Sequence, residues 1–379
     1  MVLVIAGLAF VGGIVVGTSV SRPAEGSSSK PSVIDQAAQR IAAQAAKPID
    51  QATLDQAAVQ GMLRALGDRW SAYYTPSQYD SFTQALQGRY TGVGLWIGPG
   101  TGGSVVVSSV QSGSPAATAG LASGEALVAV AGHPVEGQAL STVAGWLRGP
   151  AGTTVRVTVR EAGQPLTDAV LTRRDITTDS VTVDRLAGSV MSIRITSFTR
   201  GVGAQVRSVL AADAPSYSGG IVLDLRDDPG GLVSEAVQVV GAFVHGGVVV
   251  SYQQRGSAPQ VLDATGNGDS STPLVVLVDG NTASAAEIVA GALQDRGRAV
   301  VIGSQTYGKG SVQEPSTLSD GSAIEFTIGR YYTPSGRSID GVGITPDVLL
   351  PAQSDPDLAE QRSLVVLHGL AVALGSESH

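Results

Sequence analysis

The segment from Pro273 to Gln313 constrains the fold and chemistry of this chain more than any other. An apolar run, LVVLV, ends in a turn of small residues, and Ser284 stands where the helical run AAEIVAGAL begins. A second apolar run, AVVIG, leads to Lys309, which has a glycine on each side. The pattern predicts two buried strands joined by a helix. It also combines a serine at a helix start with a lysine in a glycine-rich loop, the two groups that a Ser–Lys hydrolase needs.

Strand-like and helical runs alternate around this segment, from Val181 to Leu350. GGIVLDLR, for example, is followed by LVSEAVQVVGAFV. Such alternation predicts an α/β layer with parallel strands. Upstream, the residues from Val33 to about Ala85 have helical spacing, and those from Gly88 to Asp175 form short β-runs separated by Gly/Pro turns.

These changes of pattern divide the chain into six parts. The predicted parts are a signal peptide or membrane anchor (1–21), a linker (22–32), a helical region (33–87), a β-rich module (88–177), an α/β core (178–350) and a helical tail (351–379).

The stretch from Val2 to Val20 carries no charge, and a Ser/Pro-rich linker follows it. Its 19 residues are close to the roughly 20 needed for one membrane span. We therefore expect export or membrane anchoring, with the remaining domains outside the cytoplasm. The pattern does not distinguish a cleaved signal from a retained anchor.

Composition argues against several classes of function. The net charge is −8 and there is no long basic run, which disfavours nucleic-acid binding. The chain has no cysteine, and its four histidines lack the spacing of metal ligands. No metal or other cofactor is expected.

Two glycine-rich motifs suggest nucleotide binding but fail on context. The segment 303–310, GSQTYGKG, approaches a phosphate-binding loop, yet Gly310 stands where Ser or Thr should hold magnesium, and a strand follows instead of a helix. The segment 98–103, GPGTGG, leads into a strand and not into the helix that a dinucleotide site requires.

Each half of the Ser–Lys pair also has an ordinary interpretation. Ser284 could simply cap its helix with its hydroxyl, and Lys309 could be a solvated loop residue. The functional alternative is that helix-start amides stabilise an oxyanion beside Ser284, while a dry setting lets Lys309 lose its proton near neutral pH. Asp227 and Asp228 are interpreted as turn residues ending a strand.

The residues resemble one family, the carboxy-terminal processing or tail-specific proteases, which are serine peptidases with a PDZ domain. The similarity covers nearly everything after the linker. It is carried in the core by GGIVLDLRDDPGGL, by the segment from Asn281 to Gln313 and by YYTPSGRSIDGVGITPD, and upstream by MLRALGDRWSAYYTPSQYDSF, YTGVGL, SPAATAGLASGEALVAVAG and LRGPAGTTVRVTVR. The resemblance implies a PDZ-like β-rich domain and an α/β Ser–Lys protease core of the ClpP/crotonase-like type.

The resemblance also implies roles for individual residues of the core. Ser284 would be the nucleophile, Lys309 the general base and Gln313 the group that orients the lysine. The further implied residues are the oxyanion-hole amides of Gly231 and Ala285 and the supporting acids Glu287 and Asp295. Asp228 stands where the family usually has Asn.

In the PDZ-like module, the amides of Gly92, Val93, Gly94 and Leu95 would receive a substrate's terminal carboxylate. Arg148 matches an arginine implicated in coupling peptide binding to assembly of the active site. The resulting hypothesis is a serine endopeptidase that recognises protein substrates by apolar C-terminal tails. A catalytically silent PDZ scaffold is the alternative, a homodimer is possible, and the sequence names neither the substrate nor the activating stimulus.

Overall fold

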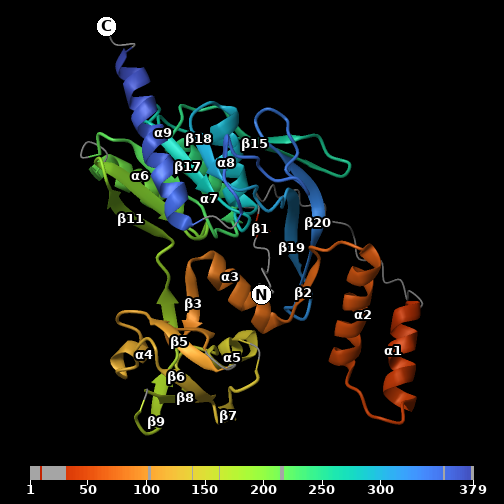
Figure 1. The fold of residues 1–379 in the computed structure, drawn as a ribbon. Coiled ribbons are helices and arrows are strands. Elements are labelled where there is room, and N and C mark those ends of the chain that lie inside the picture. The colour runs from red at the N-terminus through yellow and green to blue at the C-terminus, as the bar shows by residue number, and fades with distance from the viewer. Residues whose placement is uncertain are drawn as a thin grey trace. The chain divides into compact units, whose positions relative to one another are not determined.

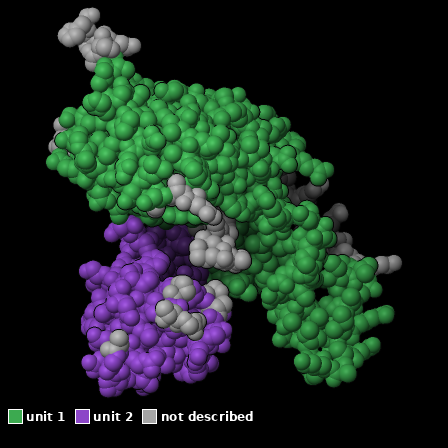
Figure 2. All heavy atoms as spheres, in the orientation of Figure 1, with its two compact units in different colours: residues 1–79, 180–379 green, residues 80–179 purple. Residues whose placement is uncertain are grey.

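The computed structural model describes residues 9–10, 31–100, 104–138, 140–161, 163–213, 217–352 and 355–376. Two compact units make up the chain (Figure 2). Unit 1 comprises residues 1–79 and 180–379, and unit 2 is the single segment 80–179 between them.

Unit 1 is built on a six-stranded sheet with the order β11-β12-β13-β17-β18-β21. Figure 1 labels β11, β17 and β18 of this sheet. Its strands are β11 (Val181–Leu186), β12 (Val190–Ile195), β13 (Ile221–Asp224), β17 (Leu274–Val278), β18 (Val300–Gly303) and β21 (Val348–Leu349). Only the β11–β12 pair is antiparallel among these neighbours. The predicted α/β layer with parallel strands is confirmed.

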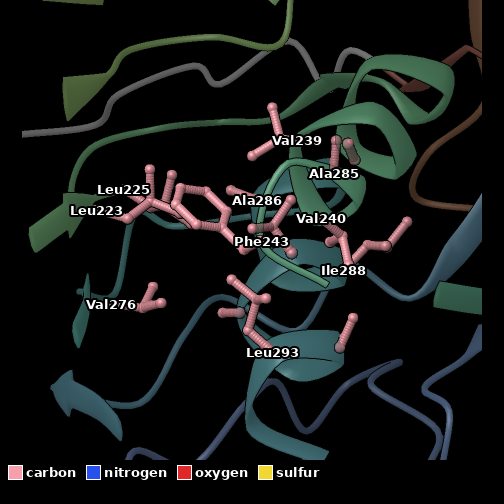
Figure 3. Packing of buried hydrophobic residues seen from close by; sticks show 14 of the residues in the cluster. Leu223, Leu225, Val239, Val240, Phe243, Val276, Ala285, Ala286, Ile288 and Leu293 are labelled. Carbon is pink, nitrogen blue, oxygen red and sulfur yellow. The ribbon is translucent and has the colours of Figure 1, made fainter. Parts of the chain in front are cut away.

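Helices cover both faces of this sheet, so its central strands are apolar on both sides. Leu223 and Val276 point into a core shared with the helices α6 (Val202–Asp213), α7 (Val233–Gly241) and α8 (Ala285–Asp295). Val275 belongs to a smaller core beside α9 (Pro356–Ser376). Figure 3 shows Ala285, Ala286, Ile288 and Leu293 of α8 packed among side chains of α7 and the sheet. The helix that follows Ser284 is therefore fixed along its length.

A second sheet in unit 1 has the order β16-β15-β20-β19, and β2 also pairs with β20. Its strands are β2 (Ala72–Tyr74), β15 (Val248–Gln254), β16 (Gln260–Asp263), β19 (Ser311–Thr317) and β20 (Ala323–Tyr332). The remaining elements of this unit are α1 (Val33–Gln44), α2 (Gln51–Leu66), the start of α3 (Pro76–Leu86), and the short parallel pair β1 (Ala9–Phe10) and β14 (Gly231–Leu232).

The helical interpretation of 33–87 misses one element, β2. It runs antiparallel to β20, with Ala72 opposite Glu325 and Tyr74 opposite Ala323. Two consecutive tyrosines after a Gly-Asp turn are typical of a short strand, but three residues give too weak a period to detect.

Unit 2 contains a sheet with the order β4-β5-β6-β8-β9, in which β7 pairs with β6. Its elements are β3 (Arg89–Gly92), β4 (Leu95–Pro99), β5 (Val105–Val110), α4 (Pro115–Thr118), β6 (Ala126–Val130), β7 (His133–Pro134), α5 (Leu140–Leu147), β8 (Thr154–Arg160), β9 (Thr167–Thr172) and β10 (Arg174–Thr177). β3 and β10 form a separate antiparallel pair. A core of its own includes Val93, Val143 and Val157, as expected for an independent module.

The predicted signal or anchor, 1–21, lies outside the described residues except for β1. Within the described ranges, no helix combines the length and the apolar character needed to cross a membrane.

Candidate active site

The turn that leads to Ser284 follows β17 and is fastened on two sides. On one side, Thr282 Oγ1 donates a hydrogen bond to Leu225 O at 2.8 Å, and Ala283 N donates to Asp228 O at 2.9 Å. On the other, Tyr307 N, in the lysine loop, donates to Thr282 O at 3.0 Å. The turn is thus bound both to the end of β13 and to the loop that carries Lys309.

The backbone of Ser284 is strained, and its hydroxyl lacks a hydrogen-bond partner among the described residues. The residue has φ 55° and ψ −116°, a conformation that a non-glycine residue adopts at a cost of about 1–3 kcal/mol. It precedes α8 as an N-cap and forms a capping-box arrangement with Glu287, yet its fully buried Oγ makes no hydrogen bond of acceptable geometry among the described residues. A serine that acted only as a helix cap would accept a backbone N–H hydrogen bond with this hydroxyl. Capping alone therefore does not explain this serine.

Glu287 joins the start of α8 to the lysine loop. Its buried carboxylate accepts four hydrogen bonds, two on each oxygen. Oε2 accepts from Ser284 N at 2.9 Å and Lys309 N at 2.8 Å, while Oε1 accepts from Thr306 Oγ1 at 2.5 Å and Gly308 N at 2.8 Å. Burial raises the pKa of Glu287, and these donors oppose that rise. Because the Ser284 and Lys309 amides share one oxygen, the two backbone segments are adjacent.

Close backbone packing explains the glycines beside Lys309. A Cβ on Gly310 would come within 2.3 Å of Asp340 N, and one on Gly308 within 3.0 Å of Val342 N. Gly341 N donates to Gly308 O at 2.9 Å, which ties the loop to the 339–343 segment. No larger residue fits at Gly310 unless the backbone shifts.

The Lys309 side chain is buried, with 2% of the residue exposed. Burial lowers the pKa of its amine to about 8, although Glu325, Glu287 and Asp68 favour the charged form. The amine lies 5.0 Å from the ring centroid of Trp70. At pH 7 roughly a tenth of such a lysine is neutral, which is the form that a general base needs.

Neither predicted partner holds the lysine amine in this structure. Ser284 Oγ has no hydrogen-bond partner, and neither does Gln313 Oε1, in the part of the chain that the structure describes. Gln313 is buried on β19, where its Nε2 donates to Ser311 Oγ at 2.6 Å and to Thr327 Oγ1 at 3.2 Å. Two buried acceptors near the lysine loop are therefore unoccupied while the amine lies over Trp70.

The backbone amides predicted to stabilise an oxyanion belong to the turn beside Ser284 and to the start of α8. A Cβ on Gly230 would come within 2.9 Å of both Ser284 Cβ and Ala285 N, so the Gly230–Gly231 turn lies against the serine. Ala285 provides the first helical N–H of α8, which has no partner inside the helix. Gly231, in β14, pairs with Phe198 and with Ala9 of β1.

Asp295 lies at the opposite end of α8 from Ser284. Its Oδ2 accepts a hydrogen bond from Ser335 N at 2.9 Å, and its Oδ1 pairs with Arg337. The structure thus brings Glu287 to the serine and lysine, whereas Asp295 fastens the loop after β20.

Of the predicted peptide-binding residues, Val93, Gly94 and Leu95 lie at one edge of the unit 2 sheet, and Gly92 ends β3. β4, which begins at Leu95, is a terminal strand of the sheet order. The carbonyl groups of Val93 and Gly94 accept hydrogen bonds from Ala116 N at 2.9 Å and Gln111 N at 3.0 Å, which fixes the loop before β4. Arg148 is exposed just after α5. An edge strand of this kind can accept a peptide as an additional strand.

Comparison with known proteins identifies two regions. A family described as peptidase family S41 matches residues 189–350, and one described as PDZ domain matches residues 106–161. The carboxy-terminal-processing protease of Bartonella bacilliformis is 35% identical over 311 residues, which is 80% of this chain and 70% of that protein. The chain belongs to peptidase family S41.

Two further relatives extend this similarity. The chloroplastic C-terminal processing peptidase of Tetradesmus obliquus is 33% identical over 350 residues, covering 88% of this chain and 74% of that protein. The solved structure of a photosystem II D1 C-terminal processing protease has a TM-score of 0.54 and 32% identity, covering 87% of this chain and 92% of that one. The S41 chain is thus a peptidase of the C-terminal-processing, PDZ-containing serine family, and the predicted resemblance is confirmed.

Sequence reasoning missed three residues that surround Lys309 in this S41 peptidase. Asp68, Trp70 and Glu325 are these residues; Asp68 and Trp70 lie far from the lysine along the chain, and Glu325 follows it on β20. Asp68 Oδ2 accepts from Thr327 N at 2.7 Å, and its Oδ1 accepts from Trp70 N at 3.0 Å, so β20 positions the tryptophan. The two consecutive tyrosines of β2 indicate a short strand beside Trp70, but nothing in the local sequence indicates that this strand pairs with β20.

Asp228 is more than the turn residue that the sequence suggested. It is fully buried, its Oδ1 accepts from Gly230 N at 2.8 Å, and its Oδ2 has no partner among the described residues. Burial raises the pKa of Asp228 well above its usual value, against the opposing effects of Gly230 N–H and Arg194. A neutral carboxyl here has nearly the shape of the asparagine that the family resemblance places at this position.

Replacing Glu287 by glutamine should lower the free energy of unfolding by about 2–3 kcal/mol, because the amide NH₂ would face backbone donors. Urea denaturation measures this loss. Glu235→Gln is the matched control, since within the described ranges the buried Glu235 accepts a single hydrogen bond, from Gly203 N at 2.9 Å, which a glutamine oxygen can keep. Equal costs for the two substitutions would contradict a special role for Glu287.

The raised pKa of Asp228 predicts a pH-dependent penalty. Its stabilising contribution is complete below the unfolded value, near 3.8, and is lost as the pH rises toward the folded value. Asp228→Asn should therefore raise the free energy of unfolding at pH 7, and the gain should shrink as the pH falls from the folded pKa toward pH 4, by at most about 1.4 kcal/mol per pH unit. A gain that is independent of pH would contradict the assignment.

Proposed function

We propose that this S41 peptidase is a Ser–Lys endopeptidase in which Ser284 is the nucleophile and Lys309 the general base. The observation that carries the proposal is the buried Ser284 hydroxyl, which has no hydrogen-bond partner among the described residues and belongs to a strained residue at the start of a helix. Glu287 links the backbone of Ser284 to that of Lys309, a buried lysine with a pKa of about 8.

In this mechanism, the neutral Lys309 amine removes the Ser284 proton as Oγ attacks the scissile carbonyl carbon. The amides of Gly231 and Ala285 stabilise the resulting oxyanion. The lysine ammonium then gives its proton to the leaving amine, and water hydrolyses the acyl-enzyme with the same lysine as base. Every proton is returned, and the enzyme is regenerated.

Proton transfer requires Lys309 to leave Trp70 and reach Ser284. A lysine side chain can change its position by rotating its four side-chain torsions, without rearrangement of the loop backbone. Gln313 Oε1 is a buried free acceptor that could hold the amine in the active position. The roles of Glu287 and Asp295 are structural support for the serine turn and for the loop after β20.

Substrate recognition is assigned to the PDZ domain. A C-terminal tail would add as a strand to β4, with its carboxylate at the amides of Gly92, Val93, Gly94 and Leu95. Apolar tail residues suit the apolar interior on which this edge rests. Coupling of tail binding to the active site through Arg148 stays a prediction.

We further propose that residues 1–21 direct the peptidase out of the cytoplasm, as a signal or a membrane anchor; the support is the uncharged stretch from Val2 to Val20. The predicted domain boundaries are kept as part of this proposal.

A homodimer stays a prediction, supported by the exposed apolar residues Val33, Ile34 and Ile41 of α1. The silent-scaffold alternative is disfavoured by the strain at Ser284, which a binding module would not need.

Ser284→Ala and Lys309→Ala should each reduce kcat for cleavage of an unfolded protein such as β-casein by at least about a thousandfold. Thermal unfolding of each variant provides the folding control. The wild-type kcat/KM should rise with pH through an ionisation near 8, since only the neutral amine is a base. Full activity in either variant, or covalent labelling by an acylating probe unaffected by Ser284→Ala, would exclude the dyad.

Tail recognition predicts a dependence on the substrate's terminal carboxylate. A peptide with an apolar tail and a free C-terminus should be cleaved with a lower KM than its amidated twin, by about tenfold or more, because amidation removes a charge-assisted contact. Equal kinetics would remove the tail-recognition proposal while leaving the dyad intact.

A further inference from the structure

The proposed mechanism does not use one buried carboxylate near the lysine, that of Glu325 on β20. The residue is 1% exposed. Its Oε2 accepts a hydrogen bond from the Tyr74 hydroxyl at 2.6 Å, and its Oε1 is buried with no partner in the described ranges. A carboxylate oxygen without a donor is costly in a protein interior unless a positive charge lies near it.

Lys309 provides that charge. The amine lies 5.0 Å from the ring centroid of Trp70, whose backbone N–H donates to Asp68. Asp68 also accepts from Thr327 N, two residues beyond Glu325 on β20, and Glu287 accepts from Lys309 N. Glu325, Glu287 and Asp68 all favour the charged form of the amine. Burial lowers the pKa of Lys309, and Glu325 raises it more than Glu287 or Asp68 does. Conversely, burial raises the pKa of Glu325, while Tyr74 and Lys309 oppose that rise.

The other two carboxylates are already engaged with backbone donors. Both oxygens of Glu287 accept hydrogen bonds, and so do both oxygens of Asp68. Of these three carboxylates, Glu325 alone has an oxygen that accepts no hydrogen bond from the described residues. Its negative charge is therefore the least compensated of the three, and the lysine amine is the cation that can compensate it.

We propose that Glu325 is a positioning residue for Lys309: its carboxylate, fixed by Tyr74, retains the protonated amine beside Trp70 and sets the pH above which the amine is released to serve Ser284. This inference rests on the proposed function, in which Lys309 is the base. It makes the β2–β20 pair part of the control of the base and not only part of the scaffold.

A purely structural role for Glu325 predicts something different. The Tyr74–Glu325 hydrogen bond would then only fasten β2 to β20, and its loss would reduce stability without changing the titration of Lys309. Glu325→Gln separates the two roles, since the glutamine oxygen can still accept from Tyr74 while the charge is removed.

The test titrates Lys309 directly in the full chain. In a Ser284→Ala background, trace acetic anhydride labels the amine at a series of pH values, and mass spectrometry of the peptide containing Lys309 gives the midpoint. Glu325→Gln should lower that midpoint by up to about one pH unit. Glu314→Gln is the matched control, because the exposed Glu314 on β19 carries the same charge and should leave the midpoint unchanged.

An unchanged midpoint in Glu325→Gln, or an equal shift in Glu314→Gln, would overturn the proposal. If thermal unfolding shows that Glu325→Gln is not folded, Glu325→Asp replaces it. The shorter side chain moves the charge back by one methylene and should lower the labelling midpoint by a smaller amount. No shift would again overturn the proposal.

The active enzyme distinguishes this inference from the proposed function. With β-casein as substrate, Glu325→Gln should move the acid limb of kcat/KM by the same amount as the labelling midpoint, raising activity up to about tenfold below the limb. A shifted labelling midpoint with an unmoved limb would mean that Lys309 is not the base, and so would overturn the proposed function while the electrostatic contact stands.

Discussion

The Glu287 carboxylate is the interaction on which the arrangement of the site depends. A buried anion is tolerated only when donors surround it, and here four donors, one at the start of α8 and three in the 306–309 loop, converge on it. Two of them are the amides of Ser284 and Lys309. The position of the lysine loop relative to α8 is thus dictated by the need to satisfy one carboxylate.

The sheet makes such a demanding contact possible. Strands β13 and β17 are buried on both faces, and α8 packs along its length against α7 and the sheet (Figure 3). A rigid framework can hold Ser284 in a conformation that an isolated turn would relax. The strain at the serine is therefore balanced by packing that lies outside the site itself.

Local patterns predicted the parts of the site that are contiguous in sequence. The alternation of strands and helices, the position of Ser284 before α8 and the glycines around Lys309 all follow from spacing and turn chemistry. The surroundings of the lysine did not follow, because Tyr74 and Glu325 are 251 residues apart and Asp68 and Thr327 are 259 apart. Asp228 was underestimated for a related reason: its burial depends on the serine turn packing over it.

The pairing of β2 with β20 has a consequence for how the peptidase can be divided. Unit 1 is assembled from two stretches of chain that flank the PDZ-containing segment. The family match, 189–350, contains Ser284 and Lys309 but omits the strand that carries Tyr74 and the turn that carries Trp70. A fragment cut at the edges of that match would expose one side of β20 and deprive the amine of its aromatic neighbour, so the smallest unit that retains the whole lysine environment is discontinuous in sequence.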